Sequence, residues 1–174
     1  MFCWPTYLNA CGADFSGRTG ESHIPETHLI PLIMAAAAGD REDIKIYGSD
    51  YDTKDGTCVR DYIHTLDLAS AHIKAMEIML ESENSLHEAI NLGTKDGYTV
   101  REVIEMVKEV TGKDFKVVET DRRAGDPDKL IANNQKAKEV LGWEPRYSDL
   151  KTIVQSAWDY YPKAQEVRKT KTKK

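Results

Sequence analysis

The sequence lacks the glycine-rich turn between a strand and a helix that a dinucleotide-binding domain needs. Such a turn lets the backbone approach a pyrophosphate group at the N-terminus of a helix. The glycines nearest to this arrangement, Gly12, Gly17 and Gly20, have the wrong spacing and lie in a polar loop, and the next expected helix begins only near Pro25. We therefore predict ordinary turns at these glycines and no dinucleotide site.

Cysteine, metal-binding motifs and long apolar runs are also scarce. The three cysteines, Cys3, Cys11 and Cys58, are an odd number without CxxC spacing, and no cleavable signal segment precedes them, so we expect a reduced, cytoplasmic chain. The five histidines form no HExxH motif, so no metal site is expected. The longest apolar run, residues 29–38, contains Pro31 and is too short to cross a bilayer, so we expect no membrane partner.

The charged residues are unevenly distributed. The chain of 174 residues has 24 basic and 29 acidic side chains, and five of the basic ones lie in the last seven positions. These are Arg168, Lys169, Lys171, Lys173 and Lys174. Without them, residues 1–167 carry a net charge of −10, which does not suit binding to a nucleic-acid backbone. We expect residues 163–174 to be a disordered basic tail and residues 1–162 to form one domain.

Strand patterns alternate with helix patterns along the chain, which favours an α/β fold. The expected strands are residues 5–9, 44–47, 89–93 and 115–119, and the expected helices are residues 25–39, 67–80, 99–112, 134–141 and 149–161. Thr99 and Glu102 have the spacing of a capping box, and Asp67 is the expected N-cap of its helix.

Tyr147 and Lys151 match the spacing YxxxK, by which a tyrosine and a lysine can meet on one helix face. We interpret the match as accidental, because Asp149 is the expected cap of this helix and leaves Tyr147 outside it. His64 with Asp67 could be drawn as an acid–base pair, but no nucleophile or metal ligand accompanies them, so structural roles are expected.

Arg60 and Arg123 are the side chains best suited to bind a ligand. The guanidinium groups of Arg60 and Arg123 can each offer two parallel donors to the oxygens of a diphosphate. Taken alone, each arginine is better explained as a surface ion-pair partner, because Asp61 and Asp126 lie close in sequence.

From Tyr7 to about Tyr161 the order of motifs is similar to the C-terminal half of bacterial UDP-glucose 4-epimerases, which belong to the extended short-chain dehydrogenase/reductase family. The motifs are TYLNACGAD, SGRTGESHIPETHLIP, IKIYGSDYDTKDGTCVRDYIHTLDLASAH, NLG, RRAGDPDKL and LGWEPRYSDL. The resemblance implies an α/β fold that keeps the last strands of a Rossmann-type sheet and a small α/β substrate-binding domain, without the N-terminal dinucleotide-binding half.

The resemblance also implies a site for a UDP-sugar. It assigns Asn9 to the neighbourhood of the diphosphate, and His28 and Leu29 to a helix start that faces the nucleotide. Tyr47 would line the uracil side, where an aromatic ring suits a base.

The same resemblance has Arg60 and Arg123 clamp the diphosphate, with Asp126 holding the ribose or orienting Arg123. Leu130 falls at the wall near the sugar. Leu8 replaces an aromatic residue that in the family flanks the nicotinamide cofactor, so it is a cofactor-site residue by family position only.

Members of the family use tightly held NAD to oxidise the sugar at C4 and to return the hydride to its other face. This sequence has no NAD fingerprint and no catalytic serine or threonine, tyrosine or lysine, so it offers no catalytic residue and is not expected to bind NAD alone. The leading hypothesis is a truncated UDP-glucose 4-epimerase homologue limited to binding UDP-sugars. The alternatives are a half-enzyme that needs a separate NAD-binding chain, a non-functional fragment, and a related sugar-nucleotide dehydratase or decarboxylase. The expected partners are a UDP-sugar and either a separate NAD-binding half or a second copy of the chain in a homodimer.

Overall fold

The computed structural model describes residues 2–82 and 87–172 and confirms the α/β class. Its helices are α1 Leu29–Ala38, α2 Thr65–Glu81, α3 Val100–Thr111, α4 Gln135–Leu141 and α5 Leu150–Thr172. Its strands are β1 Phe2–Thr6, β2 Asn9–Cys11, β3 Asp43–Tyr47, β4 Val59–Arg60, β5 Tyr62–His64, β6 His87–Asn91, β7 Tyr98–Thr99, β8 Lys116–Thr120 and β9 Lys129–Leu130. None of the helices in the described ranges is long and apolar enough to cross a membrane.

The strands form small sheets in which parallel pairing dominates. β1 pairs with β6, β2 with β5 and β3 with β8, all in parallel, while β4 lies between antiparallel β7 and parallel β9. Parallel neighbours need long crossover connections, so the paired strands lie far apart in the sequence. Helix α2 connects β5 to β6, which belong to different sheets. Each pairing therefore brings distant parts of the sequence together.

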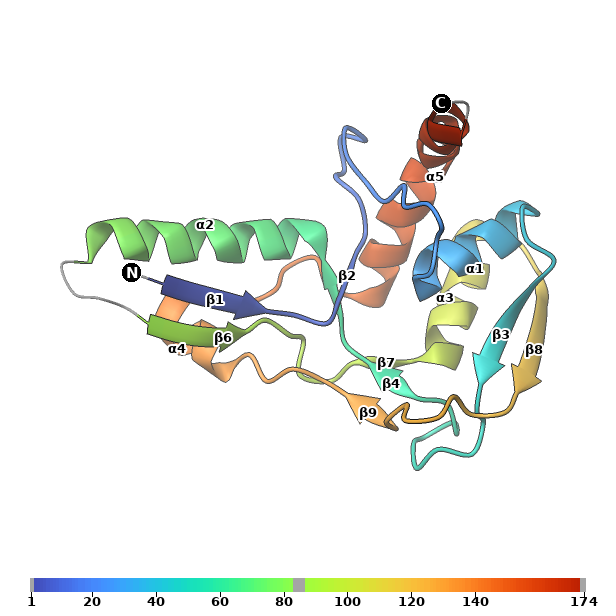
Figure 1. The fold of residues 1–174 in the computed structure, drawn as a ribbon, viewed down its shortest axis with the longest axis horizontal. Coiled ribbons are helices and arrows are strands. Elements are labelled where there is room, and N and C mark those ends of the chain that lie inside the picture. Colours follow the sequence, from blue (N-terminus) through green and yellow to red (C-terminus); the bar gives the residue numbers. More distant parts are fainter. Residues whose placement is uncertain (1, 83–86, 173–174) are drawn as a thin grey trace.

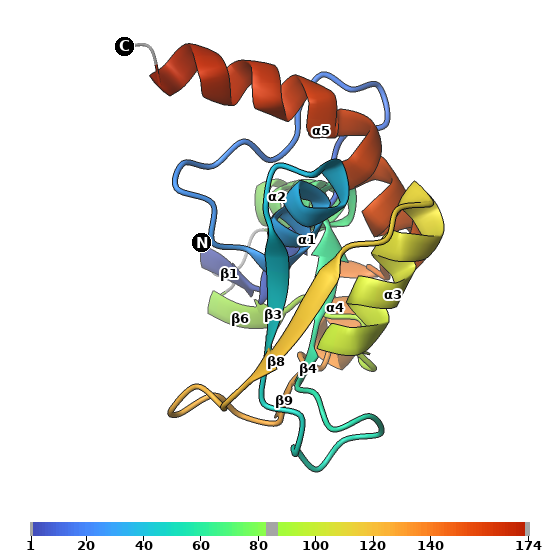
Figure 2. The same ribbon diagram turned by 90° about the vertical axis from the view of Figure 1, so that its right-hand side faces the viewer.

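Most of the elements gather around the two larger of three hydrophobic cores, and Figure 1 shows these two groups of elements at opposite ends of the view. In one, α2 runs alongside β1 and β6, and α4 packs against both α2 and β6. In the other, α1, α3 and α5 pack together beside β3 and β8, as Figure 2 shows from the side. The fully buried side chains of Ile90 and Trp143 mark the first core, and those of Ile33 and Ile153 mark the second.

The start of α3 follows the sequence pattern. The backbone N–H of Glu102 donates to Thr99 Oγ1 over 3.1 Å, and the N–H of Thr99 donates to Glu102 Oε2 over 2.9 Å, which is the predicted capping box. Gly112 ends the helix in the left-handed conformation at φ 62°.

The predicted role of Asp67 is wrong. Helix α2 begins at Thr65, and its N-cap is His64, whose Nδ1 accepts the N–H of Leu66 over 3.1 Å. Asp67 is only 1% exposed. Its carboxylate accepts the N–H groups of Arg146 and Tyr147 and the hydroxyl of Ser148 at 2.9, 2.8 and 2.6 Å, so it fixes the loop that leads into α5.

The predicted disordered tail is also corrected. Helix α5 continues through Pro162 to Thr172, and residues 173–174 lie outside the described residues. Ala164 is 2% exposed because it packs with Ala13 and Tyr160, and Lys163 Nζ donates to the carbonyl of Gly17 over 2.7 Å. The basic composition misled the prediction, since these tertiary contacts hold the helix together beyond the proline.

We expect Asp67→Asn to lower the free energy of unfolding by about 2–4 kcal/mol, because an amide can accept with one oxygen only and turns its NH₂ group toward a buried donor. Urea unfolding followed by circular dichroism measures the change. Glu77→Gln, the same replacement at an exposed position of α2, should change stability by less than about 0.5 kcal/mol. Equal effects of the two substitutions would contradict the role assigned to Asp67.

Candidate substrate-binding site

A cavity of about 280 Å³ opens between the start of α1, strand β3, strand β4 and the loop before β9. Seven of the eight substrate-site residues predicted from the sequence line it: Asn9, His28, Leu29, Tyr47, Arg60, Arg123 and Asp126. Leu130 does not line this cavity; it lies in β9 opposite Arg60 and is 42% exposed. Leu8, assigned by family position to a cofactor site, lies outside it as well and is 38% exposed.

Arg123 stacks on Tyr47. The guanidinium carbon lies 3.8 Å from the centroid of the tyrosine ring, within the range of a cation–π contact. A hydrogen bond from Arg123 lowers the pKa of the Tyr47 phenol from its ordinary value, and the nearby positive charge acts in the same direction. The ring of Tyr47 and the guanidinium of Arg123 therefore lie side by side at the cavity wall.

Arg60 forms an ion pair with Asp126, and its side chain is 13% exposed against 27% for Asp126. Arg60 also donates to the carbonyl of Val59 over 2.7 Å. The carboxylate of Asp126 thus contacts Arg60, and its expected role in holding the ribose or orienting Arg123 stays a prediction.

Asp61 does not take the role of ion-pair partner that its position beside Arg60 suggested. It is 1% exposed, and its carboxylate accepts hydrogen bonds from the N–H and hydroxyl of Thr94 and from the N–H of Ala132 at 2.6 to 3.2 Å. Asp61 therefore serves to hold the loops after β6 and β9 beside β4.

The start of α1 forms the opposite wall. Helix α1 begins at Leu29, four residues after the predicted start at Pro25. His28 is extended, and the Glu26 carboxylate accepts the N–H groups of Thr27 and His28 at 2.9 Å each. Asn9 approaches from β2, where its Nδ2 donates to the carbonyl of Asp61 over 2.7 Å. This bond fixes the orientation of the Asn9 amide, and the amide oxygen Oδ1 takes no part in it.

The charge of the cavity wall is opposite to that of the whole chain. Four cationic side chains, Arg41, Lys45, Arg60 and Arg123, line the cavity, against the single carboxylate of Asp126. The chain as a whole has a formal net charge of −5. A cleft lined by one sign of charge concentrates ligands of the other sign, so this cavity suits an anion.

Sequence reasoning missed eight of the fifteen lining residues, and three of these, Arg41, Lys45 and Tyr62, carry a charge or a phenol. For two of them a signal was present, because residues two apart in a strand face the same side. Lys45 shares its side of β3 with Tyr47, and Tyr62 follows Arg60 by two positions. Arg41 lies in the turn before β3, where its Nε donates to the carbonyl of Asp43 over 2.6 Å, and no periodicity marks such a position.

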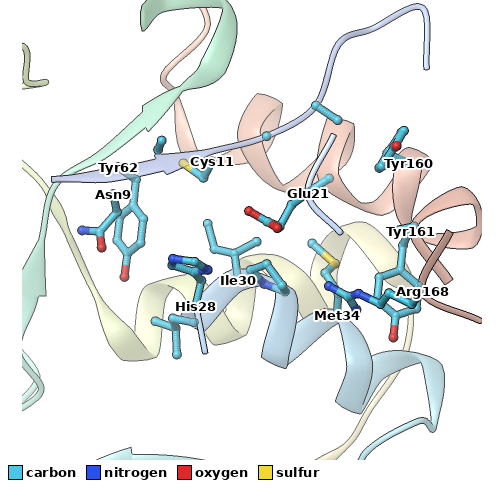
Figure 3. Close-up of a pocket in the computed structure, with 17 residues that line it drawn as sticks. Asn9, Cys11, Glu21, His28, Ile30, Met34, Tyr62, Tyr160, Tyr161 and Arg168 are labelled. Carbon is cyan, nitrogen blue, oxygen red and sulfur yellow. The ribbon is translucent and has the colours of Figure 1, made fainter. Parts of the chain in front are cut away.

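A second, smaller cavity of about 50 Å³ adjoins the first and shares Asn9, His28, Leu29 and Tyr62 with it. Its wall is mostly apolar, and Figure 3 shows the side chains of Ile30 and Met34 turned toward it. Cys11 also lines it, but burial raises the pKa of the Cys11 thiol far above its ordinary value. The thiol donates to the carbonyl of Ile63 over 3.3 Å, so it is not a nucleophile at neutral pH.

The acid–base and YxxxK patterns in the sequence do not form catalytic pairs. His64 is fully buried, its Nε2 lies 3.0 Å from Ser156 Oγ, and burial lowers the pKa of its imidazole. Tyr147 precedes α5, and Lys151 instead forms an ion pair with Glu109 at 3.0 Å. Asp149 accepts the N–H of Thr152 over 2.9 Å, as the predicted cap should.

Comparison with known proteins identifies the class of this chain. Residues 5–156 match the family model described as GDP-mannose 4,6 dehydratase, so the chain belongs to that family. The resemblance to UDP-glucose 4-epimerases within it is confirmed by a relative of that name from Rhizobium leguminosarum bv. trifolii, which is 54% identical over 160 residues. The match covers 92% of this chain and 48% of the relative.

Solved structures agree with this assignment. The UDP-glucose 4-epimerase from Brucella ovis in complex with NAD superposes with a TM-score of 0.86 at 47% identity, over 91% of this chain and 48% of that one. The enzyme from Bifidobacterium longum in complex with NAD⁺ and UDP gives a TM-score of 0.82 at 34% identity, over 92% and 47%. The chain spans about half the length of the curated relatives it matches, and the predicted half of an extended dehydrogenase fold is confirmed.

Proposed function

We propose that this chain binds UDP-sugars in the cavity between α1, β3 and β4. The observation that carries the proposal is the concentration of four cationic side chains in that cavity of an acidic chain. A nucleoside diphosphate sugar brings two phosphate charges and an aromatic base. The cationic wall suits the phosphates, and the Tyr47 ring suits the base.

The two arginines are expected to act differently. Arg60 is held by Asp126 and by the carbonyl of Val59, so it offers a prearranged guanidinium to the diphosphate. Arg123 stacks on Tyr47, and a move from the ring to a phosphate would free the face of the ring for uracil. Charge-assisted hydrogen bonds of this kind contribute about 1.5–3 kcal/mol each.

Asn9 and His28 complete the proposed site near the diphosphate, and Leu29 contributes apolar wall next to Tyr47. Leu130 lies in β9 opposite Arg60 and just outside the cavity, so we propose that it influences which hexose fits rather than whether the nucleotide binds. NAD has no assigned place in these residues. The free thiols of Cys11 and Cys58 fit the proposed reducing, cytoplasmic setting.

We expect Arg60→Ala and Arg123→Ala each to weaken binding of UDP and UDP-glucose about tenfold or more, because each removes a charged donor from the diphosphate. Isothermal titration calorimetry measures the affinities. Arg101→Ala is the matched control, since Arg101 pairs with Glu119 outside the cavity and its side chain is 39% exposed. Equal binding heats for the unchanged chain and for the double variant would remove the assigned site.

We propose, as a second candidate function, that the chain is the substrate half of an enzyme completed by a separate NAD-binding chain. The supporting observation is an apolar stripe on α2, where Ile73, Met76 and Leu80 are 51%, 52% and 80% exposed at helical spacing. A helix face of this kind normally packs against another element. Within the described ranges, β1 pairs only with β6 and β2 only with β5. Each of the two strands therefore has one edge at which a further strand could pair.

Purified alone, the chain should carry no NAD and show no epimerisation of UDP-glucose.

Co-expression with the N-terminal half of the Rhizobium leguminosarum relative should give a complex with NAD-dependent activity, assayed by formation of UDP-galactose. The double substitution Ile73→Asp with Met76→Asp should abolish the complex by burying charge, whereas Ile24→Asp, at another exposed apolar position, should not. Stoichiometric NAD in the isolated chain, or a complex that tolerates both aspartates on α2, would refute this second candidate.

A further inference from the structure

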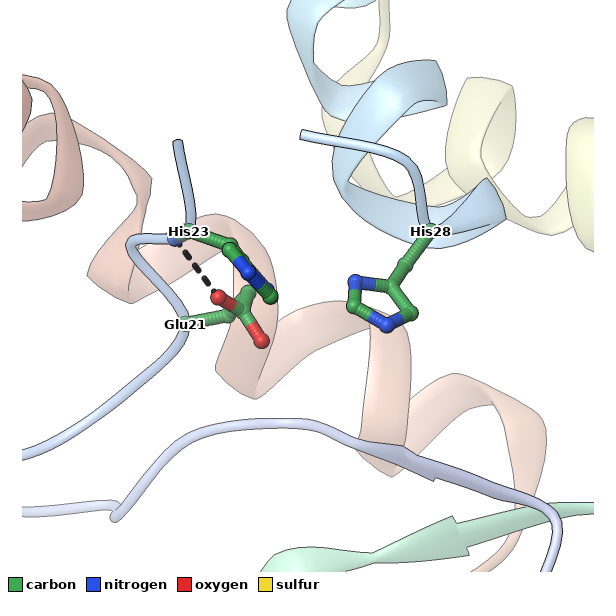
Figure 4. Close-up of side chains that lie close together, drawn as sticks. All are labelled: Glu21, His23 and His28. Carbon is green, nitrogen blue, oxygen red and sulfur yellow. Dashed lines mark hydrogen bonds between the residues drawn. The ribbon is translucent and has the colours of Figure 1, made fainter. Parts of the chain in front are cut away.

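Glu21, His23 and His28 come together in the loop that precedes α1. One carboxylate oxygen of Glu21 and one ring nitrogen from each histidine lie within 4.8 Å of one another. All three residues are exposed. Figure 4 shows Glu21 and His23 facing the ring of His28. No sequence motif indicates this group, because its spacing matches no metal-binding motif and its residues come from a loop rather than from one helix face.

His28 is held in an orientation that suits a metal ligand. Its Nδ1 lies 2.9 Å from Oε1 of Glu26, and because a carboxylate only accepts, this contact favours the neutral tautomer with the proton on Nδ1 and the lone pair on Nε2. Glu26 is itself fixed, since its side chain is 11% exposed and its Oε2 pairs with Arg168 at 2.7 Å. A histidine that donates its second nitrogen to a carboxylate is the usual arrangement around protein-bound metal ions.

Glu21 is likewise prearranged. Its Oε1 accepts the backbone N–H of His23 over 2.7 Å, which leaves Oε2 available. The rings of His23 and His28 lie 5.6 Å apart between centroids and are inclined by 40°, so neither is stacked tightly on the other. The two imidazoles and one carboxylate oxygen can therefore turn toward a common point.

We propose that Glu21, His23 and His28 bind one divalent transition-metal ion of the Zn²⁺ class. Ligands around tetrahedral Zn²⁺ stand about 3.4 Å apart, given bonds of about 2.0–2.2 Å. The group must therefore contract by at most roughly 1.4 Å, which rotation of exposed side chains can supply. Two imidazoles favour Zn²⁺, Ni²⁺ or Co²⁺ over Mg²⁺ and Ca²⁺, which prefer oxygen ligands. Water would take the remaining coordination position.

This metal site is distinct from the proposed nucleotide site, although His28 borders both. Glu21 and His23 line a separate cavity with Thr19 and Gly20 and do not line the one that holds Arg60 and Arg123. Substitutions at Glu21 and His23 therefore test metal binding without touching the wall proposed for the nucleotide.

Titration of the full chain with ZnCl₂ alone, in a buffer that does not chelate metals, should give about one ion per chain with a Kd in the micromolar range. His23→Ala and Glu21→Gln should each raise the Kd about tenfold or more. Co²⁺ added to the unchanged chain should produce visible d–d absorption, and Mg²⁺ should not compete. His72→Ala, which removes an exposed histidine on α2, should leave the Zn²⁺ affinity unchanged.

Circular dichroism of each variant separates loss of ligands from loss of the fold. Absence of Zn²⁺ binding to the unchanged chain, or equal affinity in the unchanged chain and in the His23→Ala, Glu21→Gln double variant, overturns the proposal. Neither result bears on UDP binding, which is measured in a metal-free buffer, so the two proposals fail separately.

Discussion

Two buried carboxylates on either side of β5 hold the molecule together around its candidate site. Asp61 accepts hydrogen bonds from Thr94 and Ala132, and Asp67 accepts three from the loop before α5. Because neighbouring residues of an extended segment face opposite sides, turning Asp61 into the interior turns Arg60 toward the cavity. The burial of Asp61 thus determines that Arg60, which the proposed nucleotide site needs, faces the cavity.

The electrostatics of the cavity follow from the same arrangement. A buried arginine without a partner would be costly, and Asp126 removes that cost while leaving the wall positive, since three further cations face the same space. An incoming diphosphate would compete with Asp126 for Arg60 and with the Tyr47 ring for Arg123. Both exchanges replace one favourable contact of a guanidinium by another, so in the proposed site specificity for a diphosphate would rest on its two charges and its geometry rather than on a single strong bond.

Much of the fold and of the candidate site could be predicted from the sequence, and the failures have physical causes. The capping box of Thr99 and the glycine after α3 depend on neighbouring residues only, so their patterns were sufficient. Seven cavity residues followed from a family resemblance that rests on contiguous motifs. Asp67 misled because a carboxylate near a helix start can cap that helix or bind a distant loop, and local sequence does not distinguish the two. Residues 163–172 misled because contacts with Ala13 and Gly17, almost 150 positions away, decide their conformation.

The end of α5 also supports the candidate sites. Arg168 pairs with Glu26, Glu26 receives the N–H groups of Thr27 and His28, and the same carboxylate holds the His28 ring. Arg168, in the segment expected to be disordered, therefore contacts the N-terminal end of α1 indirectly, because its partner Glu26 also holds His28. His28 borders both cavities and belongs to the proposed metal group. Because Glu26 fixes the protonated nitrogen of that ring, its other nitrogen is left to whichever ligand approaches. The contact between α5 and Glu26 thus prepares the one side chain that the nucleotide and metal proposals share.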